Sequence, residues 1–99
     1  MFWRQGDIFI VQTDGVPVGA APQLHCVLAE GEATGHSHRI DQTGAARLFL
    51  HQQTLFLRVT ADAAVVTHDE HGPITLPRGD YRVWRQREYH PKAIRVVRD

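Results

Sequence analysis

The chain has 99 residues, of which 42% are hydrophobic and 22% charged, as in an ordinary folded domain. This length predicts a single domain over residues 1–99 and excludes a large multilayer architecture. The 11 basic and 11 acidic side chains balance, and the single cysteine excludes an intrachain disulfide or a cysteine-based zinc cluster.

The amino terminus lacks the basic and then apolar segments of a secretion signal. No apolar stretch approaches the length that would span a bilayer. We therefore expect a cytoplasmic protein without membrane contact. Small β-domains often pair through exposed strands, so we also expect a homodimer or another homo-oligomer.

Short apolar or alternating runs predict β-strands along the whole chain, and no stretch of ten or more residues keeps helical spacing. Turns rich in Gly, Pro or Asp separate these runs, among them 14–15, 41–44, 69–72 and 77–80, and 51–54 is a hairpin-like connection. Eight or nine short strands predict an all-β sandwich or barrel, because closure hides strand edges. The expected strands are 6–12, 23–29, 36–40, 47–50, 55–60, 63–67, 74–76, 81–88 and a last one at 94–97.

Two pairs of histidines indicate a metal site. His36 and His38 are two positions apart, so an extended strand directs both imidazoles to the same side. His68 and His71 are three apart and converge only if the chain bends, which the sequence Asp69-Glu70-His71-Gly72 favours. We predict that the two pairs meet and bind one divalent ion, and that zinc, iron, nickel or copper suits them better than magnesium or calcium.

Carboxylates near these histidines are candidates for supporting roles. Glu32, Glu70 or Asp41 could supply an oxygen ligand or orient an imidazole. If the ion activates water or polarises a substrate, Glu70 or Glu32 is the candidate catalytic residue that moves a proton.

The carboxyl-terminal part of the chain is basic, because residues 78–98 contain seven basic and two acidic side chains. One explanation is a solvated basic edge strand. Another is a site for a small polar or anionic ligand, and a third is a surface for nucleic acid. The candidate substrate-binding residues on this stretch are Arg82, Gln86, Arg87 and Tyr89. Arg82, Arg85 or Arg87 could hold an anionic substrate by bidentate hydrogen bonds.

Residues 31–38, Gly-Glu-Ala-Thr-Gly-His-Ser-His, resemble the first motif of the cupin superfamily, in which a glycine is followed by His-x-His. The resemblance implies a small jelly-roll β-barrel that holds a metal through histidines and a glutamate, in a dioxygenase, isomerase, sugar-binding module or storage protein. The glutamate expected after His-x-His is absent here, since Asp41, Gln42 and Thr43 occupy that region.

The chain also resembles a family of short bacterial proteins whose pattern has three elements, here residues 31–38, 68–74 and 86–89. In that pattern the position of His90 is not fixed as histidine, which favours His68 and His71 as ligands over His90. Three functions stay open: a metal-dependent enzyme, a non-catalytic metal- or ligand-binding subunit, and a nucleic-acid-binding β-domain.

Overall fold

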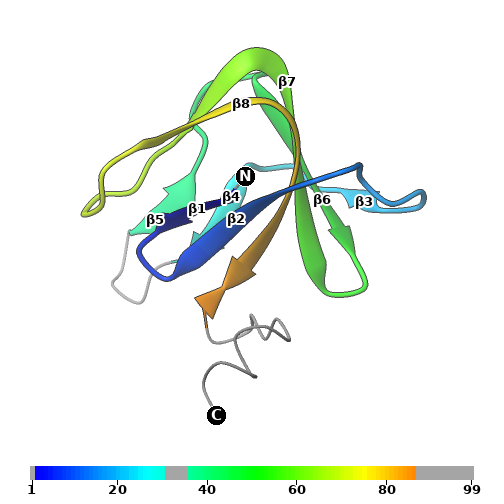
Figure 1. Ribbon diagram of the computed structural model, residues 1–99, viewed down its shortest axis with the longest axis horizontal. Helices are drawn as coiled ribbons and strands as arrows, with labels where there is room; N and C mark the ends of the chain where they lie inside the picture. Colours follow the sequence, from blue (N-terminus) through cyan, green and yellow to red (C-terminus); the bar gives the residue numbers. More distant parts are fainter. Residues whose placement is uncertain (1, 31–35, 87–99) are drawn as a thin grey trace.

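The computed structural model describes residues 2–30 and 36–86, and this part of the chain consists of β-strands without an α-helix. The all-β class and the expectation of about eight strands are therefore confirmed (Figure 1). Within the same residues, no helix has the length and hydrophobicity needed to cross a bilayer.

Six strands form one antiparallel sheet in the order β1-β2-β8-β7-β6-β3, and β4 pairs with β5 in a second sheet. The strands are β1 (Phe2–Gln5), β2 (Ile8–Thr13), β3 (Ala21–Pro22), β4 (Val27–Glu30), β5 (Ser37–Arg39), β6 (Ala46–His51), β7 (Thr54–Val66) and β8 (Ile74–Arg85).

The two longest strands, β7 and β8, bend and form the arch at the top of Figure 1. Their pairing shifts from Val59 with Gly79 to Ala63 with Pro77, so β7 bulges there. Arg78 holds the bulge by donating hydrogen bonds to the Thr60 carbonyl and to Asp62, each at 2.7 Å. The predicted turn at 77–80 is therefore wrong, because β8 bends at these residues without reversing.

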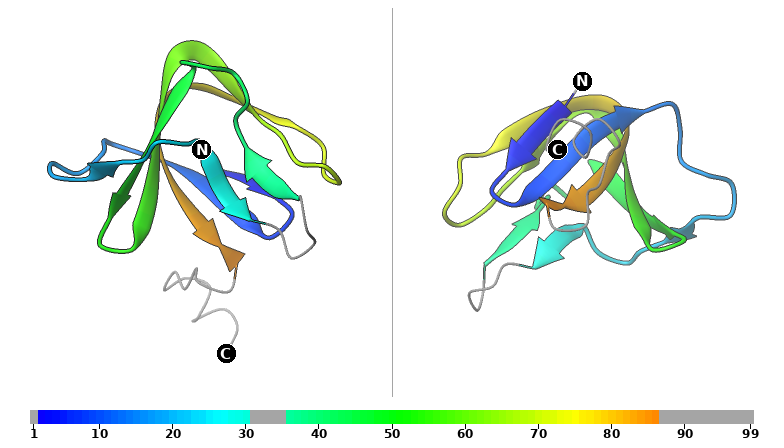
Figure 2. Two further views of the ribbon diagram at one scale, coloured as in Figure 1. Left: turned by 180° about the vertical axis from the view of Figure 1, so that it is seen from behind. Right: turned by 60° about the horizontal axis from the view of Figure 1, so that its bottom comes forward.

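The small sheet continues from the end of β7 and faces the large sheet as a second layer (Figure 2). Arg39 of β5 exchanges two backbone hydrogen bonds with Thr67, at 3.0 and 2.7 Å. This bridge places β5 beside the loop that joins β7 to β8. The apolar core lies between the layers and contains Ile8, Ile10, Leu28, Ile40, Leu48, Leu57, Val59, Val66, Leu76, Tyr81 and Val83.

The start of the chain differs from the prediction. The strand expected at 6–12 begins at Ile8, and a separate strand, β1, precedes it. Gly6 and Asp7 form the two-residue turn of the β1–β2 hairpin, in which Gln5 pairs with Ile8. Gly6 has φ +58°, a conformation that glycine adopts without strain. The turn places Gln5 and Asp7 beside β5.

Candidate metal centre

The structure brings together the imidazole rings of all four predicted histidines. His36 and His38 belong to β5 and its entry, whereas His68 and His71 lie in the β7–β8 loop. His68 is central, with ring centres at 6.0 Å from His36, 4.3 Å from His38 and 4.7 Å from His71. The two sequence pairs therefore occupy one place in the fold.

His38 is the fixed member of the cluster, since its side chain is only 2% exposed. Its Nδ1 lies 2.9 Å from Oε1 of Gln5, which is also buried. The Gln5 Nε2 group donates hydrogen bonds to the carbonyls of Val66 and Gly72, at 3.0 and 2.9 Å. Carbonyls only accept, so the Gln5 amide has one possible orientation, and His38 Nδ1 must be the donor to its oxygen. In neutral His38 the lone pair is consequently on Nε2.

That Nε2 atom faces the carboxylate of Asp7, at 3.3 Å from Oδ1. Burial, followed by the neighbouring His68, lowers the pKa of His38 below its ordinary value of 6.5, and Asp7 opposes this by favouring the charged ring. When His38 is neutral, two lone-pair-bearing atoms point at each other across 3.3 Å. Such a contact favours a cation between them.

The other three histidines are more accessible and less constrained. The backbone N–H of Glu70 donates to His68 Nδ1 at 3.0 Å, so neutral His68 carries its proton on Nε2. The Glu70 carboxylate lies 3.7 Å from Nδ1 of His36. Both side chains are partly exposed, at 65% for Glu70 and 28% for His36.

His71 lies directly over the β1–β2 turn. A Cβ atom added to Gly6 would come within 2.6 Å of His71 Nε2. The absence of a side chain at Gly6 therefore lets the His71 ring approach the turn that carries Asp7.

The spacing of the rings fits a shared ion. A ring centre lies about 3 Å from a zinc ion bound through nitrogen, so two imidazoles on one tetrahedral ion have centres about 5 Å apart. The separations of His68 from the other three rings and of His38 from His71 run from 4.3 to 6.3 Å, on both sides of this value. Among the described residues, however, no three His, Cys, Asp or Glu side chains form a ready-made metal-binding group. Because His68 Nδ1 is engaged by Glu70 N–H, binding requires rotation of the ring about its side-chain bonds.

The other predicted site residues either lie away from the histidine cluster or fall outside the described residues. Arg82 lies away from the histidines and stacks over Trp84, and the exposed Gln86 accepts a hydrogen bond from Arg4. Asp41 pairs with Arg39 at 3.3 Å. The structure therefore gives none of the three a place in the histidine cluster. Glu32, Arg87, Tyr89, His90 and the strand expected at 94–97 lie outside the described residues.

Two residues that the sequence analysis missed, Gln5 and Asp7, complete the surroundings of His38. Arg85, a predicted anion-binding residue, lies beside them, and its Nη1 donates to Asp7 Oδ2 at 3.1 Å. The available signal was Gly6-Asp7 between the apolar runs Phe2-Trp3 and Ile8–Val11, a pattern that indicates a tight hairpin. Recognising that turn would have placed Gln5 and Asp7 at the end of a hairpin.

We expect opposite tautomers for the two central histidines in metal-free protein at pH 8. His38 should carry its proton on Nδ1, because it donates to Gln5, and His68 on Nε2, because it accepts from Glu70. Long-range ¹H–¹⁵N NMR correlations of the imidazoles distinguish the two forms, and each ring serves as the control for the other. A shared tautomer would contradict this hydrogen-bond assignment.

Replacing Gly6→Ala should lower the free energy of unfolding by roughly 1–2 kcal/mol, the cost of a left-handed conformation with a side chain. It should also displace the His71 ring. Gly44→Ala is the matched control, because Gly44 has φ +78° and nothing within 4 Å of an added Cβ. Urea unfolding should detect a similar loss in both variants. NMR chemical shifts of the His71 ring should change only with Gly6→Ala, and equal shifts in both variants would argue against the contact.

Comparison with known proteins found a family but no described activity. Residues 4–86 match the family model described as Domain of unknown function (DUF8820). Searches of the curated proteins and of the solved structures gave no significant match. Because the match spans most of the chain, the protein belongs to the DUF8820 family.

Proposed function

We propose that this protein binds a divalent transition-metal ion at the cluster of His36, His38, His68 and His71, with Asp7 beside it. The observation that carries the proposal is the contact between His38 and Asp7. Gln5 leaves the lone pair of neutral His38 on Nε2, and that atom faces a carboxylate oxygen at 3.3 Å. A bound cation would satisfy both groups.

The cluster also combines one fixed histidine with three that can move, which supports the proposal. His38 is buried and held by Gln5, which is how proteins commonly fix the ring of a metal-ligating histidine. His36, His68 and His71 are more exposed and can turn toward an ion. Imidazoles with one carboxylate suit zinc, iron, nickel or copper better than magnesium or calcium.

A catalytic role would add proton transfer to metal binding. A bound ion with a free position can activate water, and Glu70, near His36, is the described carboxylate placed to move a proton. The resemblance to cupins, the cytoplasmic location and self-association stay predictions beside this proposal.

Single substitutions of the clustered histidines should remove metal, whereas histidines elsewhere should not. His36→Ala, His68→Ala and His71→Ala should each weaken zinc binding at least about tenfold, since even residues that only orient a ligand contribute 10–100-fold. His25→Ala and His51→Ala are matched controls outside the cluster. Zinc titration calorimetry and elemental analysis of untagged protein measure the effect.

The set of histidines whose replacement weakens zinc binding also distinguishes a catalytic from a non-catalytic site. If His38 and Asp7 need only one of the other three histidines, a four-coordinate ion keeps an open position, as in catalytic sites. If all four histidines are needed, the ion is saturated and a non-catalytic role is favoured. Equal metal content in wild type, the cluster variants and the controls would overturn the proposal.

A second candidate function comes from the outer face of the large sheet, where four arginines stack on aromatic rings. Arg82 lies 4.4 Å from the Trp84 ring centre and 5.6 Å from that of Phe56. Arg47 and Arg58 flank Phe49 at 5.9 and 5.8 Å, and Arg4 covers Phe9 at 5.5 Å.

Strand register makes this face continuous across the sheet. Phe9 pairs with Trp84, and Phe56 pairs with Phe49 on the next strand. Phe9 and Phe56 are buried, whereas Phe49 and Trp84 are partly exposed. Arginines and exposed aromatic rings on one β-face are the groups that bind the phosphates and bases of single-stranded nucleic acid. This surface is therefore the alternative to a function confined to the metal cluster.

If the outer face binds single-stranded RNA, a fluorescein-labelled 12-mer of uridine should bind with an affinity that falls steeply with salt. Four phosphate contacts predict a slope of log affinity against log salt of about −3. Arg47→Gln with Arg82→Gln should lower both affinity and slope, while His36→Ala with His71→Ala should leave them unchanged. Fluorescence anisotropy from 50 to 300 mM NaCl measures this, and a flat salt dependence would dismiss the candidate.

A further inference from the structure

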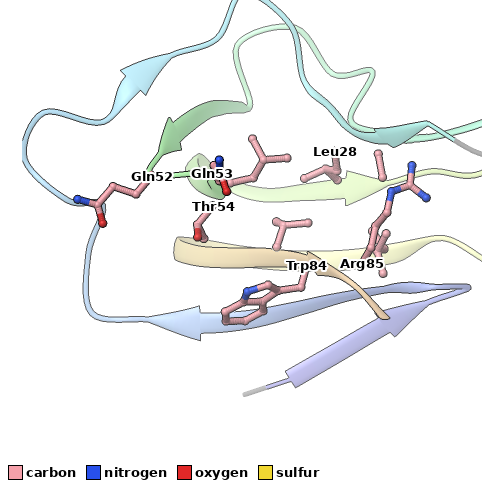
Figure 3. Close-up of a pocket in the computed structure, with 10 residues that line it drawn as sticks. Leu28, Gln52, Gln53, Thr54, Trp84 and Arg85 are labelled. Atoms are coloured by element: carbon pink, nitrogen blue, oxygen red, sulfur yellow. The ribbon is translucent and has the colours of Figure 1, made fainter. Parts of the chain in front are cut away.

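A cavity of about 650 Å³ opens between β4, the β6–β7 turn and β8. Its described lining contains one charged side chain, Arg85. Figure 3 shows Arg85 and Leu28 at one end and Gln52, Gln53 and Thr54 toward the other. This volume lies within the range of small-molecule sites in proteins.

Arg85 is held in place but retains donors for a ligand. Its Nη1 donates to Asp7 Oδ2 at 3.1 Å, and its Nη2 donates to the Glu30 carbonyl. A guanidinium has five N–H donors, so three remain after these two bonds. The side chain is 18% exposed, and its contacts with Asp7 and Glu30 fix its direction. A fixed guanidinium is well suited to bidentate binding of a carboxylate.

The rest of the cavity sets the shape of the ligand. The partly exposed Leu55 lines the cavity beside the more buried Leu28 and Val83, so one part of its wall is apolar. Gln52 and Gln53 form the β6–β7 turn with φ 49° and 67°, although glycine or asparagine is preferred in such turns. Both glutamines are exposed, and Figure 3 shows the Gln52 amide directed away from Arg85.

We propose that this cavity binds a small monocarboxylate with an apolar body, its carboxylate on Arg85 and its body against Leu28, Leu55 and Val83. This site does not depend on the metal. Asp7 joins it to the histidine cluster, because one oxygen faces His38 and the other accepts from Arg85.

The shared carboxylate predicts that the two sites affect each other, a consequence that rests on the proposed metal function. A cation beside His38 attracts Asp7 and weakens its hold on Arg85, which leaves Arg85 more available to an anion. By linkage, the anion must strengthen metal binding by the same factor.

The test uses the full chain treated with EDTA, titrated with phenylacetate and with the uncharged phenylacetamide by calorimetry. Phenylacetate should bind at least tenfold more tightly than the amide. Arg85→Gln should remove this preference, and Arg78→Gln, at the β7 bulge and outside the cavity lining, should keep it. With phenylacetate present, zinc affinity should rise at least about fivefold, and Asp7→Asn should abolish the rise.

The outcomes separate this proposal from the metal function. Equal binding of acid and amide, absence of binding by both, or retention of the preference in Arg85→Gln overturns the anion site even where zinc still binds. Loss of zinc binding with the acid preference intact overturns the metal function alone. If Arg85→Gln does not fold, the affinities of the wild type for phenylacetate and phenylacetamide still test the anion site. Zinc affinity unchanged by phenylacetate overturns the coupling through Asp7.

Discussion

The buried hydrogen bond between Gln5 and His38 is the contact on which the candidate centre depends. The Gln5 amide also donates to Val66, at the end of β7, and to Gly72, in the loop with His68 and His71. One side chain thus joins β1, β5 and the β7–β8 loop. A buried polar group left unpaired costs roughly 1–3 kcal/mol, so these segments hold one another in place.

The strands could be predicted where apolar and polar residues alternate strongly. The prediction was wrong where a strand continues through residues that usually form turns. In β8, buried Tyr81 and Val83 alternate with outward Arg82 and Trp84, within the stretch 81–88 that the sequence predicts as a strand. Pro77 and Gly79 usually mark turns, so the sequence divided this strand in two. The bulge in β7 absorbs the irregularity, and local sequence cannot reveal a bulge made by the partner strand.

The four histidines could be chosen from their spacing, because a strand and a bend each bring two imidazoles together. Gln5 and Asp7 could not be chosen in this way, since they contact His38 across more than thirty positions of sequence. Arg85 is still further from Asp7 along the chain. Such contacts follow from the register of β2 with β8 and from the placement of β5, which are properties of the assembled fold. Local sequence motifs therefore identified the four histidines but not the side chains, Gln5 and Asp7, that contact His38.

The region that matches the family contains both proposed sites. The match runs from residue 4 to residue 86, and the residues at its two ends are in contact, since Arg4 donates to Gln86 at 3.0 Å. This span contains the Gln5 and Asp7 turn, all four histidines and Arg85. Asp7 then has a role that neither site explains alone. A carboxylate needed only to neutralise Arg85 would not have to face His38, and one needed only by His38 would not have to bind a guanidinium. Its position between the two suits a group that transmits the state of one site to the other.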